Sequence, residues 1–186
     1  MGIIKSGVIN RIYGGLTGCS LDSAERLYPG ELSLASGGSL DLQQYAGKVV
    51  LVVNTASKCG FTGQYDGLEE IYQRYAARGF EILGCPSNDF ANQEPGSDEE
   101  VQSFCRINHG VTFKLLPKGS VRGAQKQQLF VFLTEKGPVD LCGEVRWNFE
   151  KFLIDRDGRL IGRWRSYVAP RSRSLRRAIE GALETR

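Results

Sequence analysis

The five cysteines are the side chains of this sequence best suited to chemistry, because a thiolate is both a nucleophile and a redox centre. They stand at positions 19, 59, 85, 105 and 142, and no two of them form a CxxC pair. Without paired ligands the sequence predicts no metal site. His109 is the only histidine, so the sequence gives little support to a Ser-His-Asp triad or to a Cys-His protease pair. The chemistry must therefore come from thiols, carboxylates or amides.

Cys59 has the surroundings expected of a reactive thiol. It lies in the segment Ser57-Lys-Cys-Gly-Phe-Thr62, after an apolar run and before a predicted helix. A helix N-terminus presents unpaired N–H groups and a partial positive charge, and both favour a thiolate. Thr62 excludes the CxxC motif of a disulfide reductase, and Gly63 excludes the CxxxC motif of a copper chaperone. We predict that Cys59 attacks peroxides, the alternative being a small buried residue that closes a strand–helix contact.

The elements that must hold Cys59 are a strand, a helix and a second strand. Val49–Val53 is a continuous apolar run, typical of a strand buried on both faces. Apolar residues at helical spacing follow Cys59, and Gly79 stands where a C-terminal cap belongs. Phe80–Pro86 is a second apolar run. This order predicts one βαβ unit with parallel strands.

The rest of the chain adds further alternating elements. Ser97 to Glu100 form a capping box, which predicts a helix running to about Arg106. The other predicted elements are a hairpin of Glu31–Ala35 and Ser39–Leu42, a helix over Ala124–Lys136 with a rival strand over Leu129–Leu133, a second hairpin of Asn148–Ile154 and Leu160–Trp164, and a last helix over Leu175–Leu183. Together they predict an α/β, thioredoxin-like fold: a central mixed sheet flanked by helices, with an N-terminal hairpin.

Length, charge and hydropathy limit the classes of protein to consider. A net charge of +3 is too small to indicate a nucleic-acid partner, and no apolar run approaches the ~20 residues of a membrane span. The 186 residues suit a single domain, which we place at residues 31–186 after an N-terminal extension of residues 1–30. The unpaired cysteines favour a reducing, cytoplasmic location.

Two short lipidation patterns occur in the extension. Met1–Ser6 fits a myristoylation signal, and Leu16–Cys19 is similar to a lipoprotein cleavage box. Arg11 interrupts the apolar stretch that a secretory signal needs, and short patterns match often by chance. We therefore expect an unmodified extension.

Three separated segments resemble the glutathione peroxidase family, in its cysteine-containing form. They are Val53-Asn-Thr-Ala-Ser-Lys-Cys-Gly-Phe-Thr62, Asn92-Gln-Glu-Pro-Gly-Ser97 and Trp147-Asn-Phe-Glu-Lys-Phe-Leu-Ile154, and the similarity covers about residues 31–170. The resemblance implies a catalytic tetrad of Cys59, Gln93, Trp147 and Asn148. The amide and indole N–H groups are neutral donors, able to stabilise a thiolate and the peroxide oxygens. Taken singly, Trp147 could equally be a core residue and Asn148 a cap at a strand edge.

The resemblance also suggests how the oxidised thiol is recycled. Cys105 matches the resolving cysteine of thioredoxin-dependent members, although it could also be an apolar face residue beside Phe104. Cys142 is the alternative resolving residue, and Cys85 and Cys19 receive no role. The implied activity is reduction of hydrogen peroxide and organic or lipid hydroperoxides, through a Cys59 sulfenic acid and a Cys59–Cys105 disulfide.

Thioredoxin is the expected reductant, glutathione the alternative, and no cofactor is expected. A peroxide sensor that passes its disulfide to a partner, and a non-catalytic binding module, remain open. The chain lacks the inserted loop of tetrameric members, so we expect a monomer. It also departs from the family pattern at Ser87, Asp89 and Lys114, close to the expected mouth of the site.

Overall fold

The computed structural model describes residues 25–28, 30–34 and 38–185. Both lipidation patterns and Cys19 lie outside the described residues. No helix in the described part of the chain has the length and apolar character needed to cross a membrane. The predicted boundary at residue 30 stays a prediction, but Leu27 and Tyr28, on its N-terminal side, are buried in the core.

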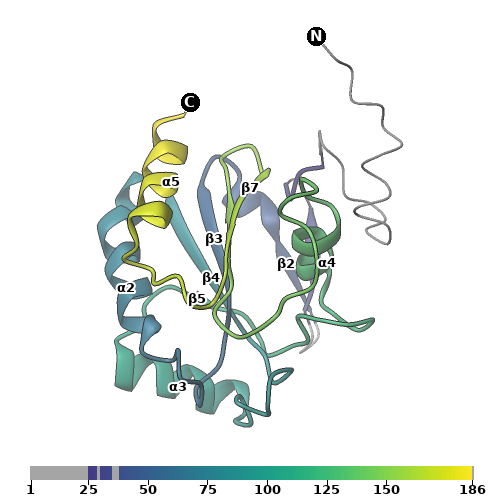
Figure 1. Cartoon of the computed structure of the whole chain (residues 1–186), viewed down its shortest axis with the longest axis vertical. Coiled ribbons are helices and arrows are strands. Elements are labelled where there is room, and N and C mark those ends of the chain that lie inside the picture. Colours follow the sequence, from purple (N-terminus) through teal and green to yellow (C-terminus); the bar gives the residue numbers. More distant parts are fainter. Residues whose placement is uncertain (1–24, 29, 35–37, 186) are drawn as a thin grey trace.

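A five-stranded mixed sheet forms the centre of the molecule (Figure 1). Its strands, in spatial order, are β5 (Lys114–Leu115), β4 (Phe80–Pro86), β3 (Val49–Thr55), β6 (Lys151–Ile154) and β7 (Leu160–Trp164). The first three are parallel, whereas β6 runs antiparallel to β3 and β7 antiparallel to β6. This is the predicted thioredoxin-like arrangement.

The predicted βαβ unit is confirmed. β3 and β4 pair in parallel, and α2 (Gln64–Tyr75) connects them. A short 3₁₀ turn, η2 (Ala76–Arg78), extends this helix, and Gly79 ends it in the left-handed conformation with φ of 86°. Every residue of β3 is buried, as the continuous apolar run requires for a strand covered on both faces.

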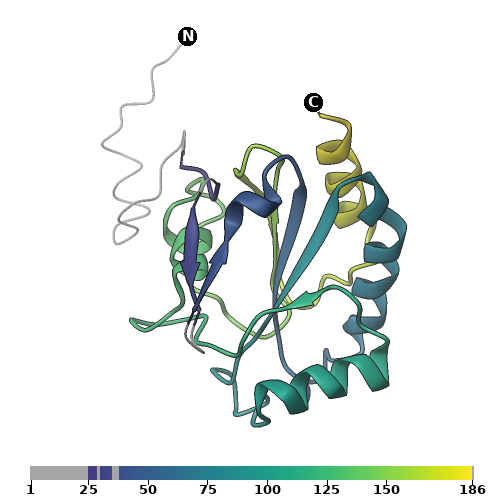
Figure 2. The ribbon, with the colours of Figure 1, turned by 180° about the vertical axis from the view of Figure 1, so that it is seen from behind.

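Helices cover both faces of the sheet (Figures 1 and 2). Val49, Leu51 and Val53 point to one side, where they pack with α2, α3 (Asp98–His109) and α5 (Arg173–Glu184). Val50 and Val52 point to the other side, toward α4 (Gln128–Glu135) and the antiparallel hairpin of β1 (Glu31–Ser33) and β2 (Ser39–Asp41). A 3₁₀ turn, η1 (Leu42–Tyr45), leads from the hairpin to β3. The two cores follow from the alternation of side chains along a strand.

Three predicted boundaries are corrected by the structure. The segment with two rival predictions is a helix, and the rival strand over Leu129–Leu133 is wrong. That helix is shorter than predicted, because Lys126 N–H bonds back to Gly123 C=O in a turn. The capped helix α3 runs past Arg106 to His109, where Gly110 caps it. β6 begins at Lys151 instead of Asn148, because the chain turns before it with Phe149 at a positive φ of 64°.

Candidate active site

Asn54, near the C-terminal end of β3, fixes the turn that precedes β6. Its side-chain amide donates to the carbonyl of Trp147 (3.0 Å) and accepts from the N–H of Glu150 (3.0 Å). Its backbone carbonyl accepts from Phe149 N–H at 2.6 Å. One buried residue therefore binds the 147–150 turn at three points, beside the segment that leads to Cys59. The sequence reading missed this role, since an asparagine at a strand end gives no local sign of a distant partner.

Cys59 lies in a turn that Thr62 closes. Cys59 N–H donates to Thr62 Oγ1 (3.0 Å), and that hydroxyl donates to Ala56 C=O (2.9 Å). The thiol is 9% exposed, and its sulfur accepts a hydrogen bond from Phe61 N–H at 3.4 Å. Cys59 lies between β3 and α2, as predicted, but α2 begins only at Gln64, so Cys59 is not part of the first helical turn. The N–H that reaches the sulfur belongs to the preceding turn.

Gln93 connects the Cys59 turn to the 147–150 turn. Its backbone carbonyl accepts from Lys58 N–H (3.0 Å), next to the thiol. Its side-chain oxygen accepts from Asn148 Nδ2 (3.0 Å), and Asn148 is completely buried. Two of the predicted tetrad residues thus touch each other, and one of them is bonded to the residue before Cys59.

Trp147 lies at the surface of the same turn. Its ring packs against Phe90 with 5.5 Å between ring centroids, and 37% of the residue is exposed. Among the described residues, no hydrogen bond joins the Cys59 sulfur to Gln93, Trp147 or Asn148. The fold links Gln93 to the Cys59 turn through its backbone and to Asn148 through its side chain, but it binds none of the three donors to the sulfur.

Left-handed backbone conformations occur on both sides of this region. Ala91 and Asn92, which precede Gln93, both have φ of 52°, and Phe149, which follows Asn148, has φ of 64°. They are the only non-glycine residues with positive φ in the described part of the chain. Such conformations persist where the surrounding structure holds them, and they cluster at functional sites.

The Glu94 carboxyl is a buried acidic group next to the Cys59 turn. Ser57 Oγ donates to one of its oxygens, and Glu94 N–H donates to Asn88 Oδ1 at 2.8 Å. Burial raises the pKa of Glu94, while the bonds from Ser57 and the charges of Lys118 and Lys58 oppose that shift. Glu94 therefore holds the turn that carries the thiol against the loop that carries Gln93.

Cys105 lies on α3 and is completely buried. Burial raises the pKa of its thiol to about 11. The Tyr65 hydroxyl lies beside the Cys105 thiol and the Thr55 hydroxyl, but it meets full hydrogen-bond geometry with neither. An intact α3 therefore holds Cys105 as a protonated thiol inside the core.

Among the described residues the free thiols are Cys59, Cys85 and Cys105. Cys85 is enclosed in β4, and burial raises its pKa. Cys142, the alternative resolving residue, lies in the irregular segment between α4 and Trp147 and is disulfide-bonded, so it offers no free thiol for resolution in this structure.

The departures from the family pattern have differing structural surroundings. The Asp89 carboxylate accepts from Val121 N–H (2.7 Å) and from Ser120 Oγ (3.0 Å), so it anchors the segment that follows β5. Ser87 is buried, and Lys114 is an exposed residue of β5. Asp89 thus has a structural function at the edge of the site.

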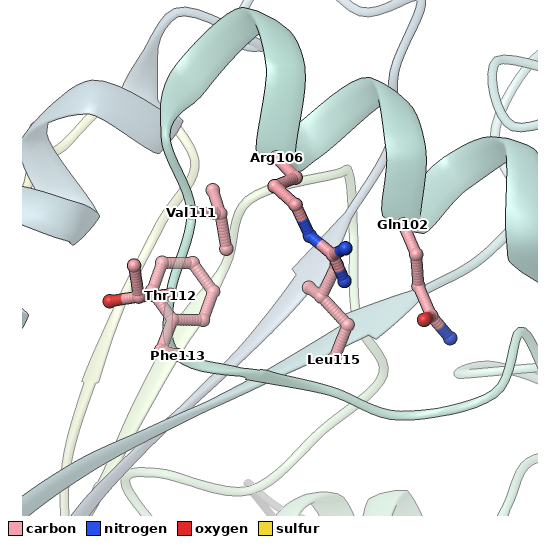
Figure 3. Close-up of a pocket in the computed structure, with 6 residues that line it drawn as sticks. All are labelled: Gln102, Arg106, Val111, Thr112, Phe113 and Leu115. Carbon is pink, nitrogen blue, oxygen red and sulfur yellow. The ribbon is translucent and has the colours of Figure 1, made fainter.

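Three pockets flank the Cys59 turn. One of 420 Å³ includes Trp147 together with Phe61 and Tyr167, one of 390 Å³ includes Ser57, Lys58 and Phe104, and one of 220 Å³ includes Gly60, Phe61 and Gly63. A further pocket of 260 Å³ lies between α3 and the segment that enters β5 (Figure 3). Its six residues, drawn in Figure 3, include none of the predicted site residues. In the part of the chain that the structure describes, no three histidine, cysteine or acidic side chains gather as a metal site would require.

Comparisons with known proteins identify the family of this chain. A family model described as glutathione peroxidase matches residues 27–134. A glutathione peroxidase-like peroxiredoxin of Schizosaccharomyces pombe is 52% identical, over 72% of this chain and 85% of its own length. A glutathione peroxidase of Lactococcus lactis is 48% identical, over 73% of this chain and 86% of its own length. The crystal structure of a protein called Trgpx, in apo form, superposes with a TM-score of 0.69 at 38% identity, covering 88% of this chain and 98% of the other.

Proposed function

Because the chain belongs to the glutathione peroxidase family, we propose that it reduces hydroperoxides with Cys59 as the attacking thiol. One observation carries the assignment of the site. Gln93 binds the residue before Cys59 through its backbone and Asn148 through its side chain, so the thiol turn and the amide donors form one unit. Trp147 stands beside Asn148 in the same turn and completes the proposed set.

In the first step the Cys59 thiolate attacks one oxygen of the hydroperoxide. The S–O bond forms as the O–O bond breaks, and the leaving oxygen takes a proton to become water or an alcohol. Negative charge moves from sulfur to the leaving oxygen, and neutral N–H donors stabilise it at both positions. The product on the enzyme is a Cys59 sulfenic acid.

In the second step the Cys105 thiol attacks that sulfenic acid. The S–S bond forms, the S–O bond breaks, and water leaves with the proton that the Cys105 thiol loses. Cys105 is buried within α3, so we propose that the helix unwinds locally before its sulfur reaches Cys59.

In the third step an external dithiol supplies two electrons and two protons to the disulfide. We propose thioredoxin for this step, because its second thiol resolves the mixed disulfide within one complex, whereas glutathione must collide twice. We propose a reducing compartment such as the cytoplasm for this cycle, because Cys59, Cys85 and Cys105 are free thiols, although Cys142 is disulfide-bonded. We propose that the enzyme works there as a monomer.

Peroxide consumption tests this function. The full chain is assayed with hydrogen peroxide and with an organic hydroperoxide, once with thioredoxin and its reductase and once with glutathione at matched thiol concentration. We expect turnover with thioredoxin, slower turnover with glutathione, and background rates for Cys59→Ser. Equal rates with both reductants would contradict the choice of thioredoxin, and a fully active Cys59→Ser would contradict the function itself. A single oxidation without turnover by either reductant would point to a peroxide sensor instead.

A further inference from the structure

Lys151 is a lysine with no exposed surface, directly after the 147–150 turn that carries Trp147 and Asn148. Its ammonium donates to the backbone carbonyls of Phe149 (2.8 Å), Val168 (2.8 Å) and Ser166 (3.4 Å). It also donates to the side-chain oxygen of Gln64. An ammonium has three donors and no acceptor, so a cluster made only of oxygen acceptors matches it.

The four acceptors come from separate segments. Phe149 belongs to the 147–150 turn, Ser166 and Val168 to the loop after β7, and Gln64 is the first residue of α2. Gln64 also donates from its amide nitrogen to Ser166 C=O at 2.6 Å. Lys151 therefore joins the turn of the amide donors to the helix that follows the Cys59 turn.

The contact with Phe149 acts on a strained peptide. Phe149 holds φ of 64°, which a bulky residue adopts only under external restraint. Its N–H is bound by Asn54 C=O at 2.6 Å, and its carbonyl is bound by Lys151. The ring of Phe149 meets Tyr65 edge-on, with 5.4 Å between centroids. Because Asn148 directly precedes Phe149, these restraints also set the orientation of the Asn148 side chain.

A buried ammonium is costly for the fold. Burial lowers the pKa of Lys151 to about 7, and the neighbouring Glu150 carboxylate opposes that shift. The four oxygen partners of the amino group offset part of this cost. We therefore explain this buried lysine by the geometry that its hydrogen bonds impose and not by a contribution to stability.

We propose that Lys151 is a positioning residue for the peroxide step. By binding the Phe149 carbonyl it fixes the 147–150 turn, so that Asn148 keeps its contact with Gln93 and both amides face the reacting thiol. Lys151 does not touch the peroxide. The inference rests on the proposed role of Cys59 and names a residue outside the predicted tetrad.

Two reactions of the same thiol separate positioning from general damage. In the reduced full-length protein, oxidation of Cys59 by hydrogen peroxide needs the donors, whereas alkylation by iodoacetamide has no peroxide oxygen for them to stabilise. In Lys151→Met the peroxide rate should fall by about 10- to 100-fold, the size of effect expected from displaced catalytic groups. The alkylation rate should change much less. Lys151→Arg keeps a charged donor and should recover most of the peroxide rate.

Lys126→Met is the matched control. Lys126 is also a nearly buried lysine with several oxygen partners, but these are Thr134, Glu135 and Glu144, none of which belongs to the predicted site or to the 147–150 turn. Its peroxide and alkylation rates should equal those of the wild type. Thermal unfolding will show whether Lys151→Met folds. If it does not, Lys151→Gln takes its place. We then expect the ratio of peroxide rate to alkylation rate to be lower in Lys151→Gln than in Lys151→Arg.

Two results would overturn the inference. One is a ratio of peroxide rate to alkylation rate in Lys151→Met that equals the wild-type ratio. When Lys151→Met does not fold, the same result in both Lys151→Gln and Lys151→Arg would overturn it. The other is an equal fall of that ratio in Lys126→Met. A wild-type Cys59 that does not react with peroxide would instead refute the proposed function, so the two failures are distinguishable.

Discussion

The Gln93 amide near Cys59 is oriented by Asn148. Gln93 uses its side-chain oxygen to accept from Asn148. In the proposed mechanism its NH₂ group is the part that it presents to a thiolate or to a peroxide oxygen. A neutral donor stabilises negative charge without transferring a proton of its own. In the proposed site such donors act where other thiol enzymes use a histidine.

Removing either amide should slow the oxidation of Cys59. Loss of one donor to a developing negative charge typically costs about 10²–10³ in rate. We expect this loss in Gln93→Ala and in Asn148→Ala, measured by stopped-flow with hydrogen peroxide on the reduced protein. The matched control is Asn108→Ala, which removes an exposed amide from the far end of α3. Wild-type oxidation rates in both site variants would mean that these amides are only structural.

The raised pKa of Cys105 should control its reactivity in the folded protein. Burial moves the pKa from 9.0 to about 11, so the thiolate needed for alkylation appears only at high pH. In the folded protein iodoacetamide should label Cys105 slowly until the pH approaches that value. In urea the labelling rate of Cys105 should have the pH dependence of an ordinary thiol. Labelling of the native protein at the unfolded rate near pH 8 would contradict the burial.

The same shift has a consequence for stability. Between pH 9 and about 11 the unfolded chain loses the Cys105 proton while the folded protein keeps it, so the free energy of unfolding should fall as the pH rises through this window. Cys85 and buried tyrosines act in the same direction, so the comparison is with Cys105→Ser. That variant should lose less stability over the window than the wild type.

At the scale of elements, the proposed second step requires α3 to open. It presents only Val101 and Cys105 as buried residues. At its N-terminal end the Asp98 carboxylate accepts a hydrogen bond from Lys118 N–H at 2.7 Å. At its C-terminal end His109 Nδ1 lies 2.7 Å from Asp66 of α2, and the His109 ring packs between Tyr65 and Phe104. A helix with so few buried residues is suited to local unwinding.

Hydrogen exchange can follow this unwinding. Residues 98–109 should lose protection when the disulfide forms, while β3 stays protected. His109→Ala removes the C-terminal contacts of α3 with Asp66 and Tyr65 and should therefore speed conversion of the sulfenic acid to the disulfide. Asn108→Ala leaves those contacts in place and should not. Unchanged protection of α3 after oxidation would show that Cys105 reaches Cys59 without unwinding.

The elements also show where sequence patterns are sufficient and where they are not. β3, α2 and β4 were predictable, because an apolar run, a helical stripe and a glycine cap are local signals. The turn before β6 was predicted as strand, since nothing local indicates that Phe149 adopts a positive φ. The residues of the site were named by resemblance, but Asn54, Thr62 and Lys151 were missed. Their roles depend on partners distant in sequence or on the closing of a turn.

At the scale of the whole molecule, the described surface offers little for self-association. Its exposed large apolar residues are Ile107, Trp147, Ile161 and Tyr167. Stable interfaces bury roughly 1,200 Å² or more of total surface, with an apolar core at their centre. We therefore expect a monomer in analytical ultracentrifugation of the reduced protein, over the concentrations used for the assays. A concentration-independent dimer would contradict this.

The central claim is that Cys59 receives the peroxide oxygen, and trapping the sulfenic acid tests it most directly. The reduced Cys105→Ser variant is mixed with stoichiometric hydrogen peroxide in the presence of dimedone, and the modified peptide is mapped by mass spectrometry. Without Cys105 the sulfenic acid should persist long enough to be trapped, so we expect dimedone on Cys59. Dimedone on Cys85 in place of Cys59, or no consumption of peroxide by the variant, would contradict the account.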